Sequence, residues 1–277
     1  MINLNGQLVE SIDNSLAANR GFLFGDAVFE TLKIVDNKIL FLEDHYFRLM
    51  ASMRIMRMEI AMNFTMEYFE SQILALTKNL EIADCARCRF SVYRNPGGFY
   101  SPKSNEISFV IKAEKLTNKT FQQNNRSYEV ELFKDFHVAK NLLSTLKTNN
   151  KAINVLASIF AKENDFQNCL LINESKNVIE ATNGNIFMVL GNTITTPPIS
   201  EGCLNGILRK QIISIVKKTN DYTIVEEPIS PFDLQKADEL FITNIISGIQ
   251  PITKYRKKEF ATNCANLLTE KLNTLIQ

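Results

Sequence analysis

The grouping of strand-forming segments sets the tightest limit on the fold of this 277-residue chain. Two hairpins are predicted, one around Asn5-Gly6 with strands at 1–4 and 7–9, and one around Asp36-Asn37 with strands at 27–35 and 38–42. Helical spacing follows over 44–58 and over 65–79, where Thr65 can act as the N-cap. Two more strands, 87–94 and 106–113, flank the turn residues Asn95-Pro96-Gly97-Gly98.

Residues 114–127 are polar without clear periodicity, so they predict a connection between two halves of the chain. After them we predict, in order, strand 128–133, helix 147–164, strands 168–173, 178–182, 185–190 and 193–196, helix 206–219, strand 222–227, a capped helix start at Ser230-Pro231-Phe232-Asp233, strand 239–243 and a C-terminal helix from about 260. Regular alternation of strand and helix is missing, which disfavours a doubly wound sheet or a (β/α)₈ barrel. We expect an α+β protein with mixed sheets and helices, in which a domain at 1–115 and a larger one at 128–277 are joined by a linker at 116–127.

Composition excludes several classes of protein. Apolar residues make up 45% of the chain and the formal net charge is +1, which is typical of a globular protein with a core. No long run of like charges occurs, so nucleic acid and membrane surfaces are not expected partners. Apolar stretches are of strand length, and the first residues do not resemble a signal peptide. We therefore expect a cytoplasmic protein that acts on a small molecule.

Cysteine and histidine usage argues against disulfide and metal chemistry. The five cysteines are an odd number, and the single CxxC motif, Cys85 to Cys88, lacks the second pair that a zinc ribbon needs. We interpret Cys85 and Cys88 as two buried thiols. His45 and His137 are the only histidines, so no metal site is expected. Nucleophile-elbow, phosphate-loop and dinucleotide-binding signatures are absent.

Three features suggest one chemistry when they are taken together. Lys147 lies between a loop and an apolar helix, Glu180 ends a short strand, and Gly206 opens a helix. Each has an ordinary alternative: a solvated lysine, an exposed hairpin glutamate and a common helix end. Together they suit pyridoxal phosphate, because a lysine can form a Schiff base, a helix N-terminus can hold a phosphate, and a carboxylate can keep the ring nitrogen protonated. Lys140 and Lys151 are the competing lysines.

Six segments, in chain order, resemble the motifs of a known family. They are Arg20 to Thr31, Asp44-His45-Tyr46-Phe47-Arg48-Leu49, Lys147-Thr148-Asn149-Asn150, Glu180 with Asn185-Ile186-Phe187, Gly206-Ile207-Leu208-Arg209, and Phe241-Ile242-Thr243-Asn244-Ile245. The chain resembles the fold-type IV pyridoxal-phosphate enzymes, or class IV aminotransferases. The resemblance implies a two-domain fold like that of D-amino-acid aminotransferase. It also implies a homodimer with the active site at the domain interface.

The resemblance assigns roles to individual residues. It makes Lys147 the Schiff-base lysine, and it places Arg48 and the backbone N–H groups of Ile207 and Leu208 at the cofactor phosphate. Glu180 is expected to pair with the pyridine nitrogen. The resemblance also implicates Asn244 and Ile245, in the last phosphate-side loop, in cofactor binding. Two departures weaken the aminotransferase case: Leu208 stands where threonine is common, and Asn150-Lys151-Ala152 stands where branched-chain enzymes often have a tyrosine.

Two reactions are compatible with this site. Three features resemble those of 4-amino-4-deoxychorismate lyase: Thr31 after Glu30, the short length of the chain, and the loop over 243–251. This lyase releases 4-aminobenzoate and pyruvate in folate precursor synthesis. In the lyase, the Thr31 hydroxyl is expected to relay or orient a proton at the substrate. The alternative is that Thr31 serves only as a β-branched strand residue. Arg94 and Glu30 are the expected substrate contacts, and a surface arginine at a strand end is the alternative for Arg94. An aminotransferase for branched-chain L-amino acids or D-amino acids, with 2-oxoglutarate, stays open, as does a catalytically silent paralogue.

Overall fold

The computed structural model describes residues 2–4, 7–9, 16–123 and 126–276. The chain divides into two compact units. The first comprises Met1–Leu116 and Lys147–Asn150, and the second comprises Thr117–Leu146 and Lys151–Gln277. Lys147 therefore belongs to the first unit, although the sequence pattern places it inside the C-terminal domain.

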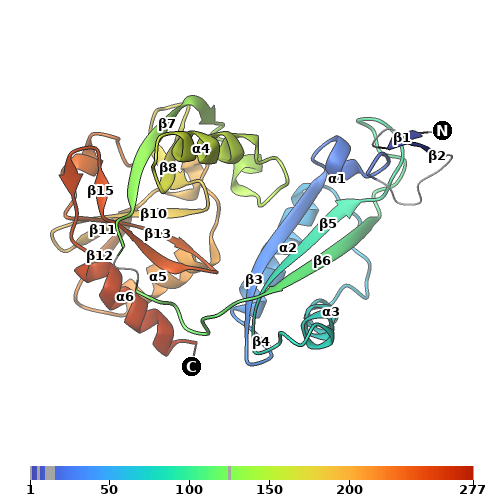
Figure 1. Ribbon diagram of the computed structural model, residues 1–277, viewed down its shortest axis with the longest axis horizontal. Helices are drawn as coiled ribbons and strands as arrows, with labels where there is room; N and C mark the ends of the chain where they lie inside the picture. Colours follow the sequence, from blue (N-terminus) through green and yellow to red (C-terminus); the bar gives the residue numbers. More distant parts are fainter. Residues whose placement is uncertain (1, 5–6, 10–15, 124–125, 277) are drawn as a thin grey trace. The chain divides into compact units, whose positions relative to one another are not determined.

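The described part of the first unit has an antiparallel sheet and three helices (Figure 1). The strand order is β4-β3-β5-β6, with β3 at Ala27–Val35, β4 at Lys38–Ile39, β5 at Cys85–Arg94 and β6 at Ile107–Lys115. The helices are α1 (Arg20–Leu23), α2 (Leu42–Ile55) and α3 (Met66–Asn79). α2 contacts β3, and α3 contacts β5 and β6. Apolar residues of β3 and β5 at alternate positions form the core with both helices, as the period of a half-buried sheet requires.

Local signals explain several of these elements. Asp36 and Asn37 have φ of 48° and 59°, the positive values that a tight two-residue hairpin turn needs. The Thr65 hydroxyl accepts the Tyr68 N–H at 3.2 Å, so the predicted N-cap of α3 is confirmed. β1 (Ile2–Leu4) and β2 (Gln7–Val9) pair antiparallel as predicted, and the turn at Asn5-Gly6 lies outside the described residues.

The prediction of a helix from residue 147 is wrong at its start, because α4 spans Ala152–Glu163. The preceding residues run along the edge of β3. Thr148 forms a β-bridge with Val28, the Phe29 N–H donates to the Lys147 carbonyl at 2.8 Å, and the Asn149 N–H donates to the Ala27 carbonyl at 3.0 Å. β4 pairs only with the last two residues of β3, so this part of the β3 edge is open to residues 147–149.

The second unit is built on a ten-stranded mixed sheet. The main order is β12-β11-β10-β9-β8-β7-β15-β16, and β13 and β14 branch from β10. β7 pairs parallel with β8 and β15, and β11 pairs parallel with β12. The strands are β7 (Glu129–Val138), β8 (Asn168–Asn173), β9 (Val178–Ala181), β10 (Gly184–Leu190), β11 (Thr193–Thr196), β12 (Thr223–Glu226), β13 (Glu239–Asn244), β14 (Gly248–Ile252), β15 (Lys254–Tyr255) and β16 (Lys258–Glu259).

Three α-helices accompany this sheet: α4, α5 (Ile207–Lys217) and α6 (Asn263–Thr274). In Figure 1, α4 lies beside β7 and β8, and α5 and α6 lie together near β13. Single 3₁₀ turns occur at Leu142–Thr145, Ile199–Glu201 and Asp233–Gln235. The helix predicted to begin at Ser230-Pro231 is therefore wrong, because the chain makes one short turn there. β14 to β16 were not predicted, since Pro251 and short segments give a weak strand signal.

Burial agrees with the prediction made for the cysteines. All five cysteines are free and buried. Burial raises the pKa of the Cys88 thiol to about 12, as expected of an inert core cysteine. Met53 and Met58 lie in the first-unit core, and Met50 and Met56 pack against it. Among the described residues, no helix combines the length and apolar character that crossing a membrane requires.

Candidate functional site

Lys147 lies on the face of the first-unit sheet opposite α2 and α3; we call this the open face because neither of these helices covers it, although its β3 side chains are buried. Its carbonyl bonds to Phe29, which places the two side chains on the same face of neighbouring extended segments. The Lys147 Nζ lies 4.7 Å from the centroid of the Phe29 ring. Lys147 is half-buried, so backbone pairing and an aromatic contact together position its amine.

Arg48, the expected phosphate-binding arginine, is held by a buried carboxylate. Its Nε donates to Glu30 Oε1 at 2.8 Å and its Nη2 donates to Glu30 Oε2 at 2.5 Å. His45 Nδ1 lies 2.7 Å from Glu30 Oε2. Burial alone would raise the pKa of Glu30, but the Arg48 guanidinium and the His45 hydrogen bond outweigh it and lower that pKa to about 2. Burial lowers the pKa of His45, and the Glu30 hydrogen bond opposes that effect.

The structure gives Glu30 a different position from the one expected. Glu30 is 1% exposed, and both of its oxygens are bonded to Arg48 or His45. A substrate would have to displace these partners to contact it. The geometry therefore argues against Glu30 as a substrate contact and for a role in orienting the Arg48 side chain.

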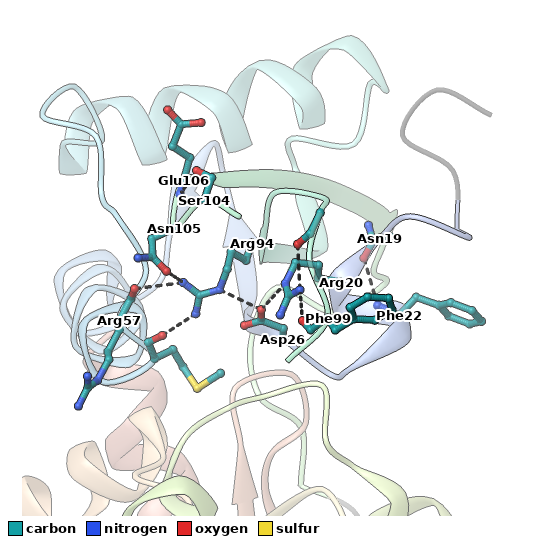
Figure 2. A network of polar contacts seen from close by, with 12 residues as sticks. Asn19, Arg20, Phe22, Asp26, Arg57, Arg94, Phe99, Ser104, Asn105 and Glu106 are labelled. Atoms are coloured by element: carbon teal, nitrogen blue, oxygen red, sulfur yellow. Dashed lines mark hydrogen bonds and ion pairs between the residues drawn. The ribbon is translucent and has the colours of Figure 1, made fainter. Parts of the chain in front are cut away.

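Arg94 is likewise bound within the protein (Figure 2). Its Nε donates to Asp26 at 2.9 Å, and its Nη2 donates to the Met56 carbonyl at 2.6 Å. Its Nη1 donates both to the Arg57 carbonyl at 3.1 Å and to the Asn105 side chain at 2.6 Å. Four of its N–H groups therefore have protein acceptors. The surface alternative is wrong, because Arg94 is buried. A contact of Arg94 with a substrate carboxylate would compete with these hydrogen bonds, and it stays a prediction.

A pocket of about 240 Å³ lies beside Arg94 in the first unit. Asp26 in its wall accepts hydrogen bonds from both Arg94 and Arg20, and Arg20 also donates to the carbonyl oxygens of Gly97 and Phe99 (Figure 2). Asn150 also lines this pocket. The two arginines thus tie the loop after β5 to the start of β3.

Thr31 lies on the open face with Lys147, as required for the role we expect of it. It is two residues from Phe29 in β3 and directly opposite Arg89 of β5. Successive side chains of a strand point to opposite faces, so Phe29 and Thr31 share one face while Glu30 points to the helices. Thr31 is largely buried, at 9% exposure.

In the second unit, Glu180 and Asn185 hold the segment that precedes α5. Glu180 accepts the Leu204 N–H at 2.9 Å, and the Asn185 side chain donates to the Leu204 carbonyl at 2.7 Å. The two residues are paired across the hairpin of β9 and β10. Two motifs that are separate in the sequence therefore meet at one residue.

The first turn of α5 fits an anion such as a phosphate. Its N-cap is Gly206, which has no capping side chain, and no acceptor is recorded for the N–H groups of Ile207 and Leu208 within the described parts of the chain. A Cβ at residue 206 would come within 1.9 Å of Asn185 Oδ1, so any larger residue would have to displace the Asn185 side chain that bonds the Leu204 carbonyl. Orphan N–H groups and the helix dipole favour an anion there.

Asn244 and Ile245 follow β13 in the second unit. The Asn244 side chain accepts the N–H groups of Ile246 and Ser247 at 3.0 and 2.9 Å, which shapes the turn into β14. Ile245 is buried. The expected contribution of this turn to a cofactor phosphate stays a prediction.

The two competing lysines have other positions. The Lys140 Nζ lies 2.5 Å from Glu201 Oε1 in an ion pair. Lys151 is the N-cap residue of α4. Of the three lysines, Lys147 alone is described against an aromatic ring on a sheet face.

Two residues of this region were not singled out from the sequence. His45 was considered for metal chemistry and as part of the motif that contains Arg48, but not as the partner of Glu30 that it proves to be. Arg89 contacts the Phe29 ring, with its Cζ 3.5 Å from the ring centroid. The alternation of β5 could have placed Arg89 on the open face, but nothing in the sequence shows that it reaches Asn149, to which its Nη2 donates at 3.0 Å.

Known proteins resemble this chain over nearly its full length. The chain is 28% identical over 275 residues to a protein of Methanocaldococcus jannaschii named "Putative branched-chain-amino-acid aminotransferase", covering 98% of this chain and 93% of that protein. It is 25% identical to D-alanine aminotransferase of Bacillus licheniformis, covering 99% and 94%.

Solved structures share the fold. A structure from Legionella pneumophila named "Putative 4-amino-4-deoxychorismate lyase" has a TM-score of 0.84 at 20% identity, covering 98% of this chain and 97% of the other. A branched-chain aminotransferase from Thermoproteus uzoniensis has a TM-score of 0.85 at 21% identity, covering 98% and 93%. The family model of amino-transferase class IV matches residues 27–255. The chain therefore belongs to the class IV aminotransferase family.

Proposed function

We propose that this protein is a pyridoxal-phosphate-dependent lyase that converts 4-amino-4-deoxychorismate into 4-aminobenzoate and pyruvate. The observation that carries the proposal is the shared sheet face of Lys147 and Thr31, which offers an amine and a hydroxyl to one substrate. The Legionella pneumophila structure named for this lyase supports it through its matching length and fold. A small-molecule substrate is consistent with the family.

The cofactor is proposed from the family and from the fit of the residues. Solved relatives include a branched-chain aminotransferase from Thermobaculum terrenum in its pyridoxal-phosphate form. Here Lys147 would bind the cofactor covalently. Arg48 and the first turn of α5 would bind its phosphate, and Glu180 would face its ring nitrogen. When bound, pyridoxal phosphate acts as an electron sink that stabilises negative charge on the substrate carbon.

The chain's own residues would then move protons. Lys147 would remove the proton from the ring carbon that carries the amine. The ether bond to the enolpyruvyl group then breaks, the ring becomes aromatic, and the leaving enolpyruvyl group takes up a proton to give pyruvate. Thr31 would orient or donate a proton on the same face. No oxidant and no amino acceptor is consumed.

Pyruvate release tests this proposal directly. Cofactor-loaded protein is mixed with freshly made 4-amino-4-deoxychorismate in the absence of any keto acid. We expect sustained release of pyruvate, abolished in Lys147→Ala and retained in Lys151→Ala, the matched control at the start of α4. A protein that holds its cofactor but releases no pyruvate would refute the lyase proposal.

Variants at Thr31 separate its hydroxyl from its shape. Thr31→Val keeps the β-branched form that suits a strand, whereas Thr31→Ser keeps the hydroxyl. We expect Thr31→Val to lower kcat by about 10²-fold or more and Thr31→Ser to restore much of it, if the hydroxyl moves a proton. Equal activity in Thr31→Val and the unaltered protein would assign Thr31 to packing alone.

An aminotransferase is the second candidate. Relatives of nearly full length are named branched-chain-amino-acid or D-alanine aminotransferase. The test is a panel of L- and D-amino acids with 2-oxoglutarate. Keto acid formation that requires 2-oxoglutarate, without pyruvate release from 4-amino-4-deoxychorismate, would favour this activity.

A further inference from the structure

Glu201 is a buried carboxylate that the proposed reaction does not use. It is 4% exposed, and its Oε1 lies 2.5 Å from the Lys140 Nζ. Its Oε2 accepts the side-chain N–H groups of Asn173 at 2.7 Å and of Asn177 at 2.8 Å. Burial would raise the pKa of Glu201, but these hydrogen bonds and the Lys140 charge outweigh it and lower that pKa. Glu201 is therefore ionised at neutral pH, with a donor on each oxygen.

The partners of Glu201 come from different segments of the second unit. Lys140 lies in residues 139–146, which follow β7. Asn173 and Asn177 border the turn between β8 and β9. Glu201 itself ends a 3₁₀ turn shortly before the N-cap of α5. One carboxylate therefore holds two connecting segments against the same turn of the sheet.

Residues 139–146 lead directly to Lys147 and are held to the rest of the second unit through Lys140. Inside the segment, the Asn141 side chain accepts the Ser144 N–H at 3.2 Å. Across the described parts of the chain, the recorded hydrogen bonds and ion pairs from this segment to other segments come from Lys140 alone. Its ammonium meets Glu201, and its N–H donates to Glu174 at 3.5 Å. The ion pair therefore limits where the chain can place Lys147.

The backbone that follows Glu201 packs on the same segment. Gly202 has a φ of 94°, and a Cβ there would come within 3.0 Å of the Ala139 carbonyl oxygen and 3.1 Å of Ser144 Oγ. Further along, the hairpin of β9 and β10 bonds both the N–H and the carbonyl of Leu204. The chain that leads to α5 is therefore fixed at Glu201 and again at Leu204.

We infer that Glu201 is a positioning residue for the cofactor site. Through Lys140 it fixes the segment that leads to Lys147, and through its own backbone it fixes the segment that leads to the first turn of α5. The inference rests on the roles that the proposed function gives to Lys147 and to α5, and it extends them to a residue that acts through others. A cofactor held by an amine and by a phosphate site depends on the placement of both, so loss of the ion pair should weaken its binding.

Release of pyridoxal phosphate from the loaded protein tests this inference. Lys140→Met removes a side chain that is 35% exposed, and Glu201→Gln keeps the shape of the buried side chain while it removes the charge. We expect each variant to release the cofactor about tenfold faster, measured by the loss of its protein-bound absorbance. The double variant should be no faster than Glu201→Gln alone, because both changes remove one ion pair. Lys134→Met, at an exposed lysine of β7, is the matched control and should release the cofactor at the unaltered rate.

Two further readouts separate positioning from a general loss of stability. Leu142 and Leu143 are 59% and 58% exposed, so chymotrypsin can report on the segment. We expect cleavage there to be several-fold faster in Lys140→Met, at a urea midpoint close to that of the unaltered protein. The pH at which the absorbance of the bound cofactor changes should also shift, because it depends on the placement of the Lys147 amine. Lys140→Arg keeps the charge and should restore both properties.

The outcomes separate this inference from the proposed function. If no pyruvate forms but cofactor release and cleavage change as expected, the lyase proposal fails and the role of Glu201 stands. If Lys140→Met and Glu201→Gln keep the release rate and the cofactor absorbance of the unaltered protein, the role of Glu201 fails whichever reaction is catalysed. It also fails if the effects of the two changes add in the double variant, or if Lys134→Met has the same effect. Should Glu201→Gln not fold, Lys140→Met and its rescue by Lys140→Arg decide the question.

Discussion

Replacement of Glu30 by glutamine should change how the stability of the protein depends on pH. The structure holds the pKa of Glu30 at about 2, against an ordinary value of 4.5, through Arg48 and His45 despite burial. At about 1.4 kcal/mol per pKa unit, the ionised carboxylate contributes about 3 kcal/mol to the free energy of unfolding. This contribution is present above pH 4.5 and is lost as the pH falls towards 2, because the unfolded state binds the proton first.

Urea unfolding at several pH values between 2.5 and 7, followed by circular dichroism, measures this effect. Glu30→Gln should lose about 3 kcal/mol at pH 7 and a smaller amount at pH 3, since at pH 3 the unfolded carboxyl already binds a proton while the folded carboxyl stays ionised. Burial lowers the pKa of His45, so both proteins also lose stability below about pH 6.5. The difference between them reports the carboxylate of Glu30 together with its hydrogen bond to His45.

A surface carboxylate provides the control for this measurement. Glu114 forms an ion pair with Arg87 at 2.6 Å, but its side chain is half exposed. Glu114→Gln should therefore change stability little at any pH. Parallel stability curves for Glu30→Gln and the unaltered protein would refute the reasoning, because they would show that Glu30 does not ionise differently in the folded state.

Three further predictions follow from packing and burial. Phe90→Ala should cost about 3–5 kcal/mol in urea unfolding, because Phe90 is fully buried among other aromatic rings, and a loss below 1 kcal/mol would contradict this. Gly206→Ala should speed the release of pyridoxal phosphate, followed by absorbance, because its Cβ would collide with Asn185; unchanged release would place the phosphate elsewhere. Burial raises the pKa of Cys88 and Cys203 to about 12, so a thiol reagent at pH 8 should label them only on unfolding, and rapid labelling of the native protein would contradict their burial.

The site could be predicted where a motif determines the conformation of its own backbone. It could not be predicted where the role of a side chain depends on residues that are distant in the sequence. Gly206 and the start of α5 follow from adjacent residues, and the structure describes them as expected. Glu30 and Arg94 were expected at the substrate, but the structure encloses both in internal bonds. A sequence shows that such residues are charged, yet it does not show which charges face one another after folding.

Local interactions explain what the sequence alone determined. The Asp36-Asn37 turn, the Thr65 cap and the alternation of β5 depend on residues within a few positions of one another, and the family motifs are also read along the chain. Tertiary structure alone decided that residues 147–149 pair with β3 and do not begin α4. It also brought Arg89 to Asn149, because a hydrogen bond between residues sixty positions apart forms only when the sheet places them together.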